Sequence, residues 1–235
     1  MKRHLQLQFP TRSLSFSLVL SITVLCSSAI QGFAQDTKKI SQTKKGEGFK
    51  ISESYSVLKS DPALKHGPYT ASISGYRETG NYDNGQRVGI WESYWKGELR
   101  YKYDFSNRKF LQQEAPLLIT KITQIDEQGN ALKELPLQNL YMGGNNKMLS
   151  IMVAAVRYPV KAMEYNVQGA VLISATLTAA AEIKDIQLES KLGYGLEEEA
   201  LRVFKLLPQE DWLPVYLDGK AVPVRFQYQF KFSLN

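Results

Sequence analysis

The sequence has almost no cysteine or histidine. Among its 235 residues there is one cysteine, Cys26, and there are two histidines, His4 and His66. Cys26 and His4 lie in an N-terminal segment that has the features of a leader, so the rest of the chain has no thiol and a single imidazole. That rest cannot form a disulfide, use a thiol nucleophile or bind zinc through sulfur. His66 directly precedes a Gly-Pro turn, and we interpret it as an exposed loop residue.

Sequence motifs of catalytic sites are also lacking. There is no Gly-rich phosphate loop, no Ser-centred elbow and no spaced pair of carboxylates with a partner. Three consecutive glutamates, residues 197–199, stand where the first turn of a helix is predicted, with Arg202 and Lys205 near its end. Because this order of charges suits the helix dipole, we interpret the glutamates as a solvated helix face. We predict that the protein is not an enzyme and has no catalytic residue, cofactor or metal ion.

The net charge is modest. The whole chain carries +6, and the leader contributes three of these positive charges and no negative ones, which leaves +3 for the remainder. The basic residues are spread along the chain and form no run with interleaved aromatic residues. Nucleic acid is therefore not an expected partner.

Residues 1–35 resemble a secretory signal peptide. The apolar stretch from 14 to 25 is short and diluted by serine and threonine, whereas a membrane-spanning helix needs about 20 predominantly apolar residues. Residues 32–34, Gly-Phe-Ala, offer small side chains for cleavage. The charged residues of the segment are all basic: Lys2, Arg3 and Arg12. We expect export to the periplasm, with anchoring in the inner membrane as the alternative if the leader is retained.

The remainder divides into three parts by composition. Residues 36–54 are mostly polar and rich in lysine, which predicts a flexible lead-in. Residues 55–135 have glycine, tyrosine and tryptophan at turn-like intervals, and residues 136–235 alternate between helical and strand patterns. We therefore expect two small domains after the lead-in.

A weak repeat runs through residues 66–110. Gly-Pro-Tyr at 67–69 recurs as Gly-Ile-Trp at 89–91, an offset of 22, and between them stands Tyr-Asp-Asn-Gly at 82–85. Asn-Gly is a strong hairpin signal because both residues tolerate positive φ. The pattern predicts an antiparallel β-meander, and it resembles the MORN-type repeats of exported bacterial proteins. That resemblance implies a scaffold or interaction surface.

The C-terminal part predicts two helices and three strands. Met148, Ile151, Met152 and Ala155 share one helix face, which Asn145 or Asn146 would cap; a second helix carries Leu196, Ala200, Val203 and Leu207 and ends before Pro208. Strands are predicted near residues 171–177, 186–188 and 222–234. In the last of these, every even position is apolar and every odd position lies outside the core. The predicted fold class is α+β, with two helices packed on one face of a three-stranded antiparallel sheet.

Residues 136–234 resemble the C-terminal domain of TonB-family proteins. The resemblance rests on the order and spacing of several short motifs: Pro136, Tyr141-Met142-Gly143-Gly144, Tyr158-Pro159, Gln168-Gly169, Glu199-Ala200, Trp212-x-Pro214 and Gly219-Lys220. It implies a periplasmic domain that binds a short extended segment of an outer-membrane receptor, in energy transduction or transport across the outer membrane. If the leader is retained, it also implies an inner-membrane motor as a partner.

Strand addition is the mechanism that we expect for such binding. A long edge strand presents unpaired N–H and C=O groups to which an extended peptide adds. Residues 222–234 are the candidate edge, with five predicted contact residues: Arg225, Gln227, Tyr228, Gln229 and Lys231. The same strand would alternatively pair with a second copy in a homodimer, or simply complete a stable sheet.

A second hypothesis is a passive periplasmic scaffold or adaptor for other periplasmic proteins. In that case the MORN-like sheet would be the main interaction surface. Trp212, beside Pro214, could be a binding anchor, but we favour the interpretation that it fills the end of a small core.

Overall fold

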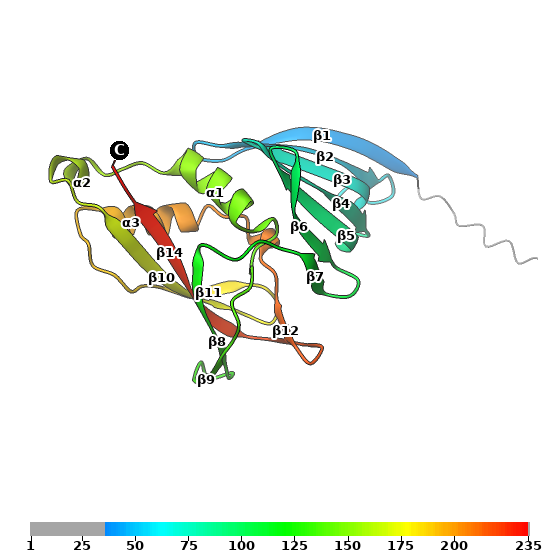
Figure 1. Cartoon of the computed structure of the whole chain (residues 1–235). Coiled ribbons are helices and arrows are strands. Elements are labelled where there is room, and N and C mark those ends of the chain that lie inside the picture. Colours follow the sequence, from blue (N-terminus) through cyan, green and yellow to red (C-terminus); the bar gives the residue numbers. More distant parts are fainter. Residues whose placement is uncertain (1–35, 235) are drawn as a thin grey trace, which may run out of the picture. The chain divides into compact units, whose positions relative to one another are not determined.

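The computed structural model describes residues 36–234. The predicted signal peptide, residues 1–35, lies outside this range. Two antiparallel sheets and three α-helices make up most of the described chain, so the α+β class is confirmed (Figure 1). Among these residues, no helix has the length and apolar character that crossing a membrane requires.

The N-terminal sheet is a seven-stranded antiparallel meander in which each strand pairs with the next along the chain. Its turns follow the glycine pattern of the sequence. Asn84 and Gly85 both have positive φ, 46° and 81°, as the Asn-Gly hairpin signal predicts. The meander is compatible with the MORN-like repeat. Its strands are β1 (Thr37–Lys45), β2 (Lys50–Leu58), β3 (Lys65–Ile73), β4 (Tyr76–Asp83), β5 (Gln86–Trp95), β6 (Glu98–Asp104) and β7 (Lys109–Gln112).

The predicted flexible lead-in is wrong. Residues 37–45 form β1, which pairs along its whole length with β2, so the meander begins almost where the described chain does. Nearly every side chain of β1 is exposed. A strand at the edge of a sheet with both faces wet has no apolar period, and lysine is common at such edges because it discourages further pairing. The polar sequence of residues 37–45 therefore gave no signal of the strand that they form.

Aromatic side chains collect on one face of the meander. Trp91 of β5 lies over Gly80 of β4, where a Cβ atom would come within 2.2 Å of the indole ring. This close approach lets the Trp91 ring reach Tyr69 of β3, with a centroid separation of 5.2 Å. The glycine of the central strand is thus required by packing rather than by a turn.

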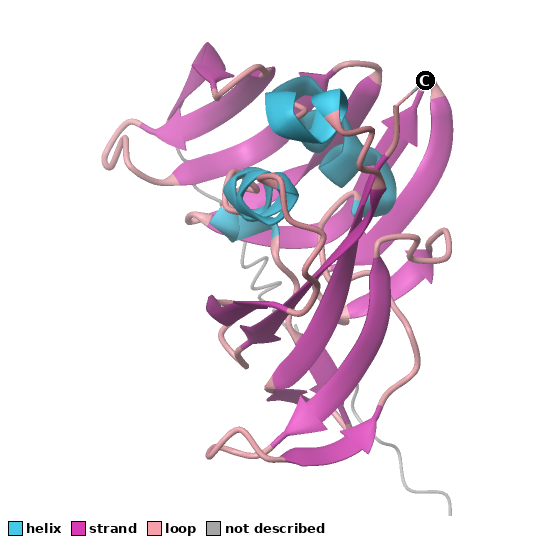
Figure 2. Cartoon of the chain, turned by 90° about the vertical axis from the view of Figure 1, so that its left-hand side faces the viewer, coloured by secondary structure: helices cyan, strands magenta, loops and turns pink. Residues whose placement is uncertain are grey.

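The C-terminal sheet has five strands, not the three that the sequence predicted. Its order is β11-β10-β14-β8-β9, and every neighbouring pair is antiparallel. Figure 2 shows the strands of the molecule in magenta and its helices in cyan. The strands are β8 (Ile119–Ile125), β9 (Ala131–Glu134), β10 (Gly169–Leu177), β11 (Ile183–Leu188) and β14 (Val224–Phe232), with a separate hairpin of β12 (Val215–Leu217) and β13 (Lys220–Val222). The two additional strands precede the predicted domain boundary at residue 135, so that boundary does not separate the two sheets.

The helices are α1 (Gly144–Ala155), α2 (Val160–Glu164) and α3 (Leu196–Phe204). Helix α1 begins after Gly143, whose φ is 81°, and no side chain caps it. The predicted cap, Asn145, has another role. Its side chain accepts the N–H of Leu117 and donates to the carbonyl of Ala115, so it holds the segment that enters β8.

Helix α1 contacts both sheets. At its start, Lys147 pairs with Glu78 of β4 at 2.8 Å. Towards its end, the sulfur of Met152 accepts a hydrogen bond from the hydroxyl of Tyr228 in β14. One continuous core of buried apolar side chains joins the two sheets through this helix. The meander and the C-terminal sheet therefore share a hydrophobic core.

Candidate functional site

The strand that the sequence predicted as an edge lies inside the sheet. Strand β14 pairs with β10 over all nine of its residues on one flank. On its other flank it pairs with β8, from Val224 to Tyr228. The prediction of a free edge along residues 222–234 is therefore wrong for the first part of the strand. The physical reason is that the chain provides its own strand for that flank.

The flank beyond Tyr228 has a different environment. Backbone groups of β14 alternate in direction: the N–H of Gln229 bonds to the carbonyl of Leu118, while even-numbered residues face β10. By the same alternation, the N–H and C=O groups of Lys231 and Ser233 point to the flank of β8. Strand β8 begins at Ile119, opposite Tyr228, so among residues 36–234 no strand pairs with this stretch. Residues 229–233 are the open half of β14, and residues 224–228 are its covered half.

An apolar groove of about 600 Å³ lies beside the open half. One wall is the last turns of α1, and the floor includes Phe230 and Phe232, which are buried. Val153 of α1 is 70% exposed on this wall, an unusual position for a large apolar side chain. We call this feature the β14 groove. Its lining residues are Leu118, Leu149, Met152, Val153, Val156, Tyr158, Phe230, Lys231, Phe232 and Ser233.

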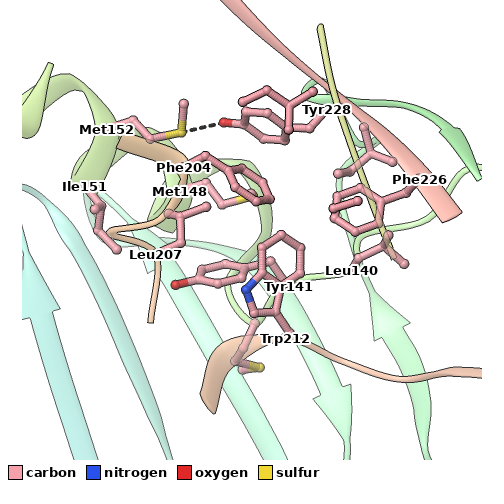
Figure 3. Close-up of a cluster of buried hydrophobic side chains, with 14 of the residues drawn as sticks. Leu140, Tyr141, Met148, Ile151, Met152, Phe204, Leu207, Trp212, Phe226 and Tyr228 are labelled. Atoms are coloured by element: carbon pink, nitrogen blue, oxygen red, sulfur yellow. Dashed lines mark hydrogen bonds between the residues drawn. The ribbon is translucent and has the colours of Figure 1, made fainter. Parts of the chain in front are cut away.

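The five predicted contact residues are divided between two environments. Tyr228 is fully buried, with its ring against Phe204 at 5.2 Å, so its side chain cannot touch a partner (Figure 3). Burial raises the pKa of its hydroxyl. Arg225 and Gln227 belong to the covered half and pair with β8. Only Gln229 and Lys231 belong to the open half, and only the backbone of Lys231 has both groups facing the open flank.

The motif residues of the resemblance have structural positions around this site. The hydroxyl of Tyr158 donates to the carbonyl of Val167 at 2.7 Å, and its ring packs on Phe232. Pro159, in extended conformation, ends the connection from α1 and precedes α2. Gly169 starts β10 with φ of +151°, where a Cβ atom would lie 3.0 Å from a side chain of Leu192.

Trp212 fills the core, as the favoured interpretation predicts. It is 4% exposed and its ring contacts those of Tyr141, Phe204 and Phe226 (Figure 3). Pro214 stands two residues after Trp212 and directly precedes β12. Both residues lie away from the lining of the β14 groove.

The covered half is held by tight packing of β8. Ile119, Ile122 and Ile125 of β8 are 3%, 0% and 5% exposed. At about 2 kcal/mol for each buried side chain of this size, exposing all three would cost about 6 kcal/mol. That is comparable to the whole stability of a typical domain. Strand β8 is therefore a structural element of the sheet.

A cluster of buried charges joins the start of α1 to the meander. The ammonium of Lys147 lies 2.8 Å from Glu78 and 2.7 Å from Asp211, and Arg87 of β5 also pairs with Asp211. Burial by itself would raise the pKa of Asp211, but Lys147 and Arg87 lower it to about 2. Burial opposes the charge of Lys147 as well, yet Asp211 and Glu78 raise its pKa. The two buried cations thus favour the charged form of Asp211, and the two neighbouring carboxylates favour the charged form of Lys147.

The three glutamates of α3 are not simply a solvated face. Glu197 is 7% exposed, and its carboxylate accepts the backbone N–H groups of Leu192 and Gly193. Glu199 accepts the N–H of Arg157 at 2.6 Å and pairs with Arg202. Glu197 thus holds the loop before α3, and Glu199 holds the segment that follows α1, whereas Glu198 is exposed. Nothing about these contacts resembles a paired acid and base.

The aromatic face of the meander is partly occupied. Tyr76 of β4 is 2% exposed. Its hydroxyl oxygen contacts Gly143 so closely that a Cβ atom on Gly143 would lie only 2.0 Å from it. The scaffold hypothesis needs this sheet as its main surface, but the face with the aromatic side chains packs against α1 and its preceding loop. Within residues 36–234, no group of three or more His, Cys, Asp or Glu side chains is placed to hold a metal ion.

Sequence reasoning missed the partner of the covering strand, because it placed that strand's residues in the N-terminal domain. Residues 117–125 are rich in β-formers, and the sequence assigned them to the N-terminal domain. The pairing of β8 with β14 joins residues about a hundred positions apart. No local signal specifies such a partner. Helix α1 and β14, by contrast, were recognisable from their periods.

Residues 154–234 match the model of the family described as Gram-negative bacterial TonB protein C-terminal. No curated protein and no solved structure gave a significant match. The matched range includes β10, β14 and α3 but not β8 or the meander, so the MORN-like interpretation of residues 66–110 stays a prediction. Residues 154–234 of the chain are therefore similar to the C-terminal domain of Gram-negative bacterial TonB proteins.

Proposed function

We propose that the protein acts in the periplasm and binds an extended segment of an outer-membrane receptor by strand addition, in support of transport across the outer membrane. The family match supports an envelope-protein partner. The observation that carries the mechanism is the open half of β14. There, the N–H and C=O groups of Lys231 face a flank on which no described strand lies, directly beside the apolar β14 groove.

Strand addition suits this place for two reasons. An incoming backbone would satisfy the N–H and C=O groups of the open half, which gives affinity without requiring one particular sequence. Its inward side chains would enter the groove between β14 and α1, which removes apolar surface from water. The opposite flank of β14 cannot serve, because β10 occupies it along the whole strand.

A proline substitution tests the mechanism at one backbone group. Lys231→Pro removes an N–H that points to the open flank, and proline is tolerated in a strand where its missing N–H faces solvent. The matched control is Lys231→Ala, which removes the same side chain but keeps the N–H. Proline at Gln227 or Tyr228 would be uninformative, because those residues pair with β8 and β10.

The measurement is calorimetric titration with synthetic peptides that tile the periplasmic segments of outer-membrane receptors from a Gram-negative host. We expect one window to bind the wild type and Lys231→Ala with affinities within a few-fold of each other, and to bind Lys231→Pro about tenfold more weakly than Lys231→Ala or worse. Circular dichroism should show the same fold for all three proteins. Equal binding by Lys231→Pro, or no binding by any window, would contradict the proposal.

A further inference from the structure

We infer that β8 is a resident strand that shortens the binding site, so that the partner is a short extended segment lying in line with β8, with apolar side chains in the β14 groove and an acidic side chain opposite Lys231. This inference rests on the proposed function and specifies its ligand. Three features of the described residues carry it: the anchoring of β8, the length of the open half and the chemistry around it.

The first feature is that β8 is anchored at both ends and in its middle. Before the strand, the side chain of Asn145 binds the backbone at Ala115 and Leu117. At its other end, the N–H of Ile125 bonds to the carbonyl of Pro223, and between them Ile122 is completely buried. A strand held in this way is not a lid, so a partner has to use the flank that β8 leaves free.

The second feature is the length of that flank. It extends from Gln229, whose N–H is already bonded to Leu118, to Ser233 near the end of the described chain. A partner strand antiparallel to β14 would run in the same direction as β8, and its C-terminal end would meet Leu118. It therefore has room to pair with about five residues. Any longer segment has to leave the sheet at that point.

The third feature is the alternation of side chains along β14. Phe230 and Phe232 face the groove, and Lys231 between them faces the outer side of the sheet. Partner residues opposite the two phenylalanines would point into the groove, towards Val153 of α1. A partner residue opposite Lys231 would share its exposed face, where opposite charges stabilise a cross-strand pair. The expected ligand pattern is apolar, acidic, apolar.

The charge of Lys231 favours the acidic residue. Lys231 has an exposed side chain and takes part in no ion pair within residues 36–234. On the outer face of the sheet, Lys121 of β8 and Arg225 of β14 are also cationic, and of these Lys121 has only a distant carboxylate, Glu134 at 3.8 Å. A carboxylate opposite Lys231 would meet the charge of Lys231 itself, because Lys121 and Arg225 lie about 13 and 20 Å farther along the strands.

The test uses a synthetic pentapeptide, Thr-Val-Glu-Val-Thr, and a nonapeptide that continues its alternation, both acetylated and amidated. Binding is followed by chemical-shift titration of the ¹⁵N-labelled protein. We expect the two peptides to bind with affinities that differ by less than about threefold, because the additional residues find no free flank. Amide exchange of β8 should be unchanged by either peptide.

Three variants test the side-chain contacts. Val153→Lys should weaken pentapeptide binding about tenfold, whereas Val160→Lys, at a valine 64% exposed on α2 outside the groove, should leave it unchanged. Lys231→Glu should reverse the charge preference, so that Thr-Val-Lys-Val-Thr becomes the better ligand. All three changed side chains are exposed, so loss of folding is not expected.

The outcomes separate this inference from the proposed function. If the nonapeptide binds much more tightly and the amides of β8 lose protection, β8 is displaced and the inference is wrong while strand addition stands. If binding occurs but ignores Val153→Lys and the charge reversal, the ligand chemistry is wrong. If no peptide of either charge shifts the amides of residues 229–233, both the inference and the proposed function fail.

Discussion

The two halves of β14 belong to one strand and share β10 on one flank, but they differ on the other. The covered half is enclosed by β8, whose isoleucines are buried. The open half has backbone groups without a strand partner in the described chain and lies beside an apolar groove. The same alternating sequence thus serves stability in one half and exposes a pairing surface in the other.

The difference continues along α1. Its start is enclosed by the charge cluster around Lys147, while its end presents Val153 to the groove at 70% exposure. Changes at the enclosed end should therefore lower the free energy of unfolding, and changes at the open end should leave it nearly unaltered. Substitutions at each end of α1 test this contrast.

The largest effect is expected at Lys147. Lys147→Ala leaves Glu78 and Asp211 buried with one fewer cation, and removing one partner of a buried ion pair typically costs about 3–5 kcal/mol. Urea denaturation would measure the loss. As a control, Lys147→Met combined with Glu78→Gln removes one cation and one carboxylate but keeps the buried pair of Arg87 and Asp211, so it should recover much of the stability. A loss below about 1 kcal/mol for Lys147→Ala would mean that the cluster does not hold the sheets together.

A slightly smaller effect is expected in β8. Ile122→Ala creates a cavity beneath the covered half and should lower the free energy of unfolding by about 3 kcal/mol. The matched control is Leu132→Ala in β9, at a leucine that is 57% exposed, with an expected change within about 0.5 kcal/mol. Both follow from the same denaturation experiment. Similar small losses for both variants would show that β8 is loosely attached.

The third-largest effect is expected from acid, which should lower the free energy of unfolding by protonating Asp211 in the charge cluster. The pKa of Asp211 is about 2 in the folded protein, below its ordinary value of 3.8, so the folded state favours its charged form. This contribution is present above about pH 4 and is lost as the pH falls through 3.8 towards 2, for a total of about 2 kcal/mol. Denaturation at pH 5, 3 and 2 would measure the slope. In Asp211→Asn the slope should be shallower; an unchanged slope would contradict the assignment.

The smallest effect is expected at the open end of α1. Val153→Lys alters an exposed side chain in the last turns of the helix, and the free energy of unfolding should change by less than about 0.5 kcal/mol. The unfolding midpoint measures it. A loss of several kcal/mol would mean that Val153 is part of a closed core, and the β14 groove would then not be an open surface.

The sequence predicted elements with strong periods and missed those that depend on distant partners. The alternation of β14, the helix face that includes Met148 and Met152, and the Asn84-Gly85 turn all have local causes. Strand β1 has no apolar period because its side chains are exposed, so its residues resembled a linker. Residues that join separate segments were also misjudged: Asn145 suited a helix cap, and Glu197 suited a solvated face.

For the candidate site, the sequence indicated strand β14 but not its surroundings. Strand addition on β14 follows from its length and alternation, and Lys231 is among the predicted contact residues. The groove could not be predicted, because it depends on the position of α1 relative to the last residues of β14. The sequence also could not show that the covered half of β14 is closed to a partner. That depends on β8, whose residues were assigned to the first predicted domain but which pairs in the second sheet.

Amide hydrogen exchange of β14, residue by residue, tests the central claim most directly. The N–H of Gln227 faces β8 and that of Phe230 faces β10, so both should exchange slowly, whereas the N–H of Lys231 faces the open flank and should exchange rapidly. Addition of a bound receptor peptide should slow the exchange of Lys231 alone among the three. If Lys231 is already as protected as Gln227 in the free protein, its flank is not open, and the division of β14 into a covered and an open half is wrong.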